Sequence, residues 1–453
     1  MPCTEILNNP RYKRITLHTL SIIFGFSSWM GVNAIFLEVP IIINSAPEGW
    51  KLSSYIVLIV QSGNIGVLLY NILQKYWPVK DAYLIYGMLG LGCLGSLLIG
   101  FLYDHTIELW GHERSLPLFI FTFMFALVAC TSSVMMMPYM GRFLKQYIIT
   151  YCMGVGIAGF ISSILALGQG SGSTTDECVP SNSTESGFEP VQVPPRFSVE
   201  LFFFIHFFLY LLSATAFILI VKMKKFRSEY AHITIRDGND YTFKRHEKEG
   251  SDTDLQDSSK ILYEKLNLIS TTEYRYLMTL TGVLSIICNS VLPSIQSFST
   301  LPYGTSTHHY SAIFSLMANP IADIIRLYTP ERSVKGITCL VGVLAIPATY
   351  IFVIALMSPN PPLQDHFMGA FLSIAAWTIY TGMYSFINVS IITIFRQQGG
   401  KSLVYNGTTA QVGSFIGAII FFILVNFTNI FKNPLTIFYC FHSDENARKT
   451  RAL

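Results

Sequence analysis

The chain has 453 residues, of which 51% are hydrophobic and only 13% are charged, and its formal net charge is +3. Soluble globular proteins carry about 25% charged residues, so this composition excludes an ordinary soluble protein and indicates a chain embedded in lipid. The small net charge, without a basic stripe, also gives no reason to expect nucleic acid as a partner.

Eleven apolar runs follow one another along the chain. Each is long enough to cross a bilayer as an α-helix, and none alternates with the period of two that is typical of membrane strands. We therefore predict an all-α polytopic membrane protein with eleven transmembrane helices. The predicted spans are 15–43, 52–74, 82–103, 116–138, 147–169, 199–222, 275–298, 307–328, 335–357, 367–395 and 405–431. The first is long enough to tilt, or to break at Pro40.

The connections between the spans predict orientation and domains. Lys and Arg are concentrated on one side, which places residues 1–14 in the cytoplasm and the tail 432–453 outside. The long outer loop 170–198 carries a sequon at Asn182, where we expect glycosylation. The polar loop 223–274 is predicted to be flexible and cytoplasmic. It separates a six-helix bundle, 15–222, from a five-helix bundle, 275–431, a plan that is typical of carriers.

Two further expectations concern cysteines and catalysis. Cys178 and Cys440 fall on the same predicted side of the membrane and are candidates for a disulfide. The chain has no GxSxG, HExxH, phosphate-loop or GxGxxG motif at a strand–helix junction, and no Cys/His cluster with metal spacing. We therefore predict no catalytic residue, no metal site and no cofactor.

Polar side chains inside the spans point to a binding site instead. Glu38 lies in the apolar stretch 29–40 without a Lys or Arg nearby, and such costly charges are usually kept for function. Trp29 and Asn33 are four residues apart and share a helix face, with Glu38 slightly over one turn further on, and Gln61 and Asn64 share a face of the next span. A structural role remains open for Glu38, which could cap helix ends around the predicted break.

More amides occur in later spans. Amides can hold helices together through hydrogen bonds, or they can line a site together with aromatic walls. The second arrangement suits a neutral planar heterocycle with polyol hydroxyls, although sugars or nucleosides fit the same chemistry. Asp323 and Arg326 are expected to form a local ion pair. Glycines in three helices predict close helix contacts, at Gly87, Gly90, Gly92, Gly95, Gly154, Gly156, Gly159, Gly413 and Gly417.

Blocks of residues in both halves resemble one family, the eukaryotic riboflavin transporters of solute carrier family 52. The blocks cover most spans and leave out the central loop and the termini. They are Trp29 and Asn33 with Phe36-Leu37-Glu38-Val39-Pro40, Pro47-Glu48-Gly49-Trp50, Gln61 with Asn64-Ile65-Gly66, Pro138 with Arg142, Ala166-Leu167-Gly168-Gln169, Asn289-Ser290-Val291-Leu292-Pro293-Ser294 with Gln296, Ala318-Asn319-Pro320, Met357-Ser358-Pro359, and Gln411-Val412-Gly413-Ser414.

The resemblance implies a plasma-membrane carrier that takes up riboflavin independently of sodium, with a fold like the major-facilitator or nucleoside carriers. We also expect a monomer. Riboflavin is then the transported substrate, and some relatives respond to external pH. The sequence departs from the family pattern at Phe36, Val155 and Ser162, where a Trp, a Glu and a Pro are usual. The candidate substrate contacts are Trp29, Asn33, Phe36, Glu38, Gln61, Asn64, Gln169, Asn289 and Gln411. A nucleoside carrier and a receptor that does not transport remain alternatives.

Overall fold

The computed structural model describes residues 9–42, 46–47, 52–77, 79–109, 111–170, 174–180, 188–192, 195–231, 233–237, 239–243, 269–330, 333–364, 366–428 and 430–431. Their fold is almost entirely helical, which confirms the predicted all-α class. The predicted glycosylation site Asn182, Cys440 and the tail 432–453 lie outside these residues, as does the side chain of Cys178.

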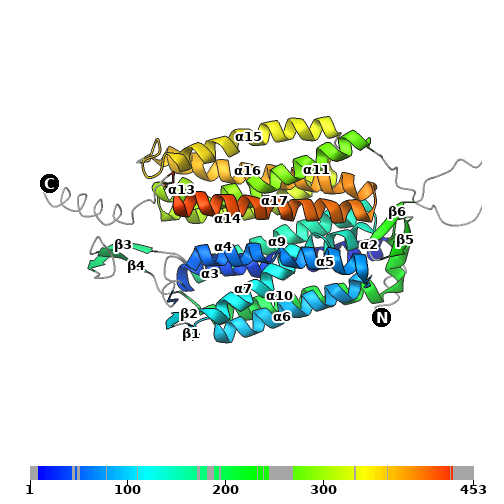
Figure 1. The fold of residues 1–453 in the computed structure, drawn as a ribbon, viewed down its shortest axis with the longest axis horizontal. Helices are drawn as coiled ribbons and strands as arrows, with labels where there is room; N and C mark the ends of the chain where they lie inside the picture. Colours follow the sequence, from blue (N-terminus) through cyan, green and yellow to red (C-terminus); the bar gives the residue numbers. More distant parts are fainter. Residues whose placement is uncertain are drawn as a thin grey trace, which may run out of the picture.

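Two groups of helices lie side by side and nearly parallel (Figure 1). The N-terminal bundle contains α2 (Pro10–Gly25), α3 (Met30–Ile42), α4 (Leu52–Ser62), α5 (Ile65–Tyr76), α6 (Asp81–Leu102), α7 (Leu116–Ser132), α8 (Met136–Gly141), α9 (Lys145–Gln169) and α10 (Val199–Lys222). The C-terminal bundle contains α11 (Thr271–Ile286), α12 (Leu292–Ser294), α13 (Gln296–Thr300), α14 (Thr305–Tyr328), α15 (Val334–Leu356), α16 (Phe367–Gln397) and α17 (Gly400–Phe427).

Three small antiparallel hairpins lie at the ends of the bundles. One end carries β1 (Ile107–Leu109) with β2 (His112–Arg114), and β3 (Thr174–Pro180) with β4 (Phe188–Gln192). The other end carries β5 (Ile233–Asp237) with β6 (Asp240–Phe243). We call these the outer end and the inner end, following the predicted orientation. Residues 224–229 and the hairpin β5–β6 show that this part of the loop predicted to be flexible is folded.

The described residues contain nine helices that are long and apolar enough to cross a membrane, or ten when the bent pair α2–α3 counts as one span. The count of eleven therefore remains a prediction. The 24-residue α14, which is not among these helices, packs between α9 and α16. Large apolar side chains cover the outside of the bundles; Phe208 is 66% exposed and Ile346 is 70% exposed. Such an apolar exterior is suited to contact with lipid.

Helix starts are encoded locally in the sequence. The side chain of Asn9 accepts a hydrogen bond from the backbone N–H of Arg11 at the start of α2. Ser270 and Glu273 form a reciprocal capping box at the start of α11. Such caps satisfy backbone N–H groups that the first helical turn leaves unpaired.

The predicted glycine contacts are confirmed at most positions and wrong at two. A methyl group added at Gly154 would collide with the backbone of Ile22, and one at Gly413 would come within 2.6 Å of the backbone oxygen of Gly282. These glycines let α9 approach α2, and α17 approach α11. Nothing lies within 4 Å of a methyl group added at Gly87 or Gly90, because both face open space on α6.

Candidate functional site

The first span is broken near its middle, where residues 26–29 form a turn between α2 and α3 and the helix axis bends by 45°. Side chains from the neighbouring α10 satisfy backbone groups at the break. The N–H of Gly31 donates to the hydroxyl of Tyr210 at 3.1 Å, and Ser213 donates to the carbonyl of Phe24 at 2.9 Å. The predicted break at Pro40 is thus wrong in position, because the bend lies more than two turns earlier. Broken helices of this kind form central sites in carriers.

Trp29 is the last residue of this turn, and Asn33 and Phe36 follow it in α3. Trp29 is half-buried against the apolar core of the N-terminal bundle. Asn33 lies at the contact between α9 and α14, since a methyl group added at Gly159 would come within 3.2 Å of its Nδ2 and 3.1 Å of Leu316. Phe36, one turn further along, is 39% exposed. The structure therefore places Asn33 where the two bundles meet.

Glu38 and Gln169 form a buried pair inside the N-terminal bundle. Both side chains are 0% exposed, and Nε2 of Gln169 donates to Oε2 of Glu38 at 3.4 Å and to the carbonyl of Phe197 at 3.2 Å. The other carboxylate oxygen, Oε1, has no hydrogen-bond partner within the described residues. A solute can reach this pair only after the helices around it move.

Gln61 and Asn64 lie at a second break, where residues 63–64 separate α4 from α5. Nδ2 of Asn64 donates to the backbone carbonyl of Gln61 at 3.0 Å and to its Oε1 at 3.2 Å. The two amides therefore bond to each other, and in the described part of the chain Oδ1 of Asn64 has no partner. The described hydrogen bond of Glu38 is to Gln169 and not to this pair.

Asn289 lies in a π-helical turn, Ile287–Val291, that interrupts the seventh predicted span. Its Nδ2 donates to Ser414 of α17 at 3.1 Å, and its Oδ1 accepts from Tyr384 of α16 at 3.3 Å. Because two neighbouring helices hold both ends of this exposed amide, its orientation is fixed. Local π-helical turns frequently occur at functional sites.

Gln411 connects the bundles. It lies one turn before Ser414 on α17, and its Nε2 donates to the hydroxyl of Ser133 at 3.4 Å. Ser133 belongs to the turn between α7 and α8, a third break in the N-terminal bundle. Ser133 is not among the residues predicted for the site. Its signal in the sequence is the polar run Thr131-Ser132-Ser133 inside a long apolar stretch.

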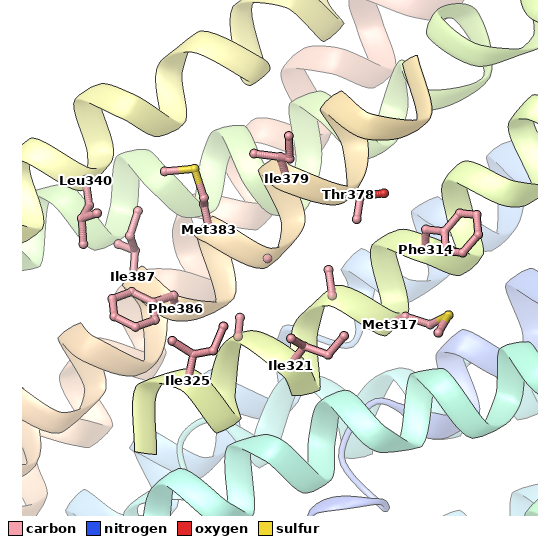
Figure 2. A pocket seen from close by; sticks show the side chains of 13 residues that line it. Phe314, Met317, Ile321, Ile325, Leu340, Thr378, Ile379, Met383, Phe386 and Ile387 are labelled. Carbon is pink, nitrogen blue, oxygen red and sulfur yellow. The ribbon is translucent and has the colours of Figure 1, made fainter. Parts of the chain in front are cut away.

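A cavity in the C-terminal bundle does not coincide with these residues. It has a volume of about 480 Å³ and lies between α14, α15 and α16 of the C-terminal bundle. Figure 2 shows that its lining is hydrocarbon apart from methionine sulfurs and the hydroxyl of Thr378, which already donates to Ile374. Ile321, Ile325 and Ile379 on its wall are more than half exposed, so this is a groove in the lipid-facing surface.

The expected ion pair between Asp323 and Arg326 is wrong. The carboxylate of Asp323 accepts from the hydroxyl of Ser385 at 2.8 Å, whereas Arg326 donates to Thr329 and Thr393. Both charged side chains are nearly fully buried. Residues three apart can pair on a helix surface, but here each side chain is drawn to a hydroxyl on α16.

Asn33 and Gln411 lie at contacts between the two bundles, and Asn289 is held by Ser414 one turn from Gln411, so these three amides define a candidate site where the bundles meet. These amides come from α3 on the N-terminal side and from the π-helical turn and α17 on the C-terminal side. Such groups both donate and accept hydrogen bonds and carry no charge, so they can recognise a neutral polar solute. Within the described residues no group of three His, Cys, Asp or Glu side chains is arranged to hold a metal ion.

Comparisons with known proteins agree with this reading. In fold, the chain is similar to a bacterial homologue of the iron transporter ferroportin, with a TM-score of 0.55, 12% identity and coverage of 94% and 95% of the two chains. This likeness confirms the major-facilitator-like fold. In sequence, it is 32% identical to solute carrier family 52, riboflavin transporter, member 3-A of Danio rerio, and 28% identical to member 3 of Homo sapiens. Both matches cover 92% of this chain and 97% of the relative.

The family model described as "Solute carrier family 52, riboflavin transporter" matches residues 13–433, which include both bundles and every candidate site residue. The chain therefore belongs to the riboflavin transporters of solute carrier family 52.

Proposed function

We propose that this protein carries riboflavin into the cell across the plasma membrane, as a monomer and without a bound cofactor. One observation supports this most strongly: in a chain of the riboflavin transporter family, one amide of each bundle, Asn33 and Gln411, lies at a contact between the bundles. The flat isoalloxazine ring would lie against Trp29 and Phe36, and the amides would bond its polar edge and the ribityl hydroxyls. The proposed contacts are Asn33, Glu38, Gln61, Asn64, Gln169, Asn289 and Gln411.

Transport proceeds by alternating access, in which the bundles rock about this central site. The arrangement in two bundles supports this mechanism, and so does the burial of Glu38 and Gln169, which become accessible only when helices move. Transport is sodium-independent. A response to external pH would act through the buried carboxylates, of which Glu38 is one of the proposed contacts.

Uptake by cells tests the substrate. Cells that lack riboflavin uptake and express the full chain should accumulate labelled riboflavin, and unlabelled riboflavin should compete. Replacing sodium with choline should leave the rate unchanged. Surface expression without accumulation would contradict the proposal, and competition by nucleosides while riboflavin is inert would identify a nucleoside carrier instead.

Epitope labelling tests the orientation. A tag at the C-terminus should bind antibody on intact cells, whereas a tag at the N-terminus should bind only after permeabilisation. The excess of Lys and Arg in the predicted inner loops supports this arrangement. The opposite labelling pattern would reverse the orientation.

A further inference from the structure

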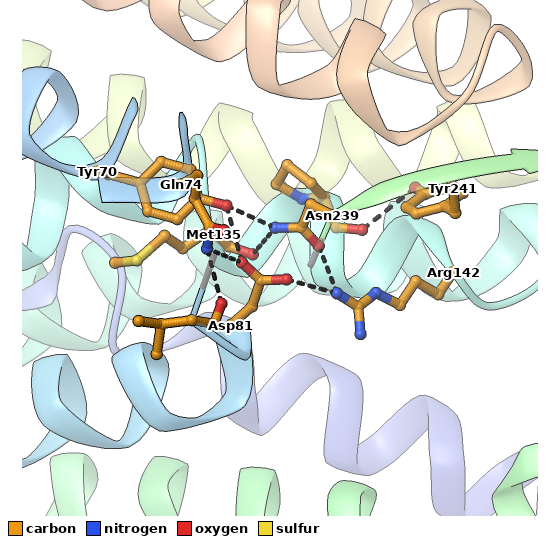
Figure 3. A network of polar contacts seen from close by, with 9 residues as sticks. Tyr70, Gln74, Asp81, Met135, Arg142, Asn239 and Tyr241 are labelled. Atoms are coloured by element: carbon orange, nitrogen blue, oxygen red, sulfur yellow. Dashed lines mark hydrogen bonds and ion pairs between the residues drawn. The ribbon is translucent and has the colours of Figure 1, made fainter. Parts of the chain in front are cut away.

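The hairpin β5–β6 lies at the inner end, where it is inserted against both bundles. Two of its side chains are buried although the surrounding loop sequence is polar: Asn239 is 5% exposed and Tyr241 is 1% exposed. Figure 3 shows both side chains directed into a polar network formed by the N-terminal bundle. Burying an amide and a phenol in a loop requires specific partners, because an unpaired polar group is costly.

Asn239 connects the hairpin to the N-terminal bundle. Its Oδ1 accepts from Nη2 of Arg142 at 2.8 Å, and its Nδ2 donates to the hydroxyl of Tyr70 at 3.1 Å and to the carbonyl of Met135 at 3.4 Å. Arg142 is itself paired with Asp81 at 2.6 Å, and Tyr70 donates to the same carboxylate at 2.8 Å. The amide thus completes a charge-assisted network that joins α5, α6 and the end of α8.

Tyr241 lies between the bundles. Its hydroxyl donates to the carbonyl of Pro138 in α8 at 3.2 Å, and a methyl group added at Gly141 would collide with that hydroxyl. On the other side, a methyl group added at Gly400, the first residue of α17, would collide with the backbone oxygen of Asn239 and the ring of Tyr241. The hairpin therefore contacts α8 and α17 at once.

Arg396 closes the same end from the C-terminal bundle. It lies near the end of α16, is 0% exposed, and donates from Nε to the carbonyl of Gly141 at 3.1 Å and from Nη2 to that of Phe143. Hydrogen bonds from a buried guanidinium to backbone carbonyls are charge-assisted and therefore strong, and here they join the two bundles. Arg396 and the hairpin therefore both connect the two bundles at the inner end.

We propose that the β5–β6 hairpin is an inner latch that stabilises the conformation closed at the inner end, with Asn239 and Tyr241 as its positioning residues. This inference rests on the proposed transport by alternating access. Each bundle supplies one face of the latch: the network around Arg142 on one side and the start of α17 on the other. Loss of the latch shifts the population toward the conformation that is open at the inner end.

A shift of this kind changes apparent affinity in opposite directions on the two sides of the membrane, because each side binds only the conformation that faces it. Labelled riboflavin flux should be measured with the full-length protein in right-side-out and inside-out vesicles. Tyr241→Ala should raise the KM for entry from the outer side roughly tenfold and lower the KM from the inner side. Thr242→Ala, at an exposed neighbour on the same strand, is the matched control and should leave both KM values unchanged.

A second pair of variants tests the opposite face of the latch. Gly400→Ala should displace the hairpin and reproduce the opposed KM changes, whereas Gly342→Ala, in open space on α15, should not. Unchanged KM values, or KM values raised on both sides, in Tyr241→Ala and Gly400→Ala would overturn the latch. If the parent chain moves no riboflavin in either vesicle type, the proposed function fails instead, so the two failures are distinguishable.

Discussion

At the scale of single residues, the candidate contacts include an amide fixed by two hydrogen bonds and buried polar atoms that lack a hydrogen-bond partner within the described residues. Both ends of Asn289 are fixed by Ser414 and Tyr384, whereas Oε1 of Glu38 and Oδ1 of Asn64 have no partner within the described residues. A buried polar atom without a partner costs about 1–3 kcal/mol. Such a cost at a site is explained if the atom finds a partner in another step of the transport cycle.

Asn289→Ala tests the held amide. The substitution should raise the KM for riboflavin roughly two- to tenfold, because one lost hydrogen bond is worth about 0.5–1.5 kcal/mol. Uptake at limiting riboflavin, corrected for surface protein, measures the change. Asn360→Ala, in an exposed turn after α15, is the control and should transport normally. An unchanged KM in Asn289→Ala would show that this amide serves helix packing and not riboflavin binding.

Glu38→Gln tests the buried carboxylate. Glutamine has the same shape and can still accept from Gln169 through its carbonyl, so the fold and the amount of surface protein should be retained. Uptake should fall roughly two- to tenfold, because the loss of one hydrogen bond costs about 0.5–1.5 kcal/mol. Normal transport in this variant would show that the carboxylate is structural.

At the scale of elements, the contacts between helices depend on a few glycines. Gly154→Ala should lower the thermal stability of the solubilised protein, because the new methyl group meets the backbone of Ile22 and overpacking costs about 1–3 kcal/mol. Gly87→Ala is the matched control on an open face of α6. It should leave stability equal or higher, since alanine favours a helix over glycine by about 1 kcal/mol. Equal loss in both variants would contradict the contact between α2 and α9.

The sequence predicts where the helices lie better than where they break. The predicted span 199–222 coincides with α10, because the run begins after a Ser198 cap and ends at Lys222. The breaks at residues 26–29 and 63–64 carry no proline, and side chains on another helix stabilise the first. Tyr210 and Ser213 at the first break belong to a helix far along the chain.

The candidate site could be predicted as a set of residues but not as an arrangement. Polar side chains in apolar runs identified Glu38, Gln61 and Asn289 because such residues are costly in lipid. Which of them meet depends on tertiary packing: Glu38 pairs with Gln169, 131 positions away, and not with the neighbouring span. The inner network was missed because Asn239 and Tyr241 lie in a polar loop, where composition favours flexibility.

At the scale of the whole molecule, the two bundles are joined at the inner end by Arg396 and by the β5–β6 hairpin, and near the middle by Gln411. The helices α9 and α14 approach each other closely where the bundles meet, since a methyl group added at Gly156 would come within 3.0 Å of Pro320. Close packing between the bundles, with hydrogen bonds at one end that can break, is suited to a rocking motion in which the bundles move as units about the central amides.

Counterflow tests the central claim most directly. Purified full-length protein in liposomes loaded with unlabelled riboflavin should accumulate labelled riboflavin from outside transiently, without sodium and without any added energy source. Liposomes loaded with a nucleoside should show no such accumulation. If riboflavin-loaded liposomes with correctly folded protein take up no more label than protein-free liposomes, this chain is not a riboflavin carrier.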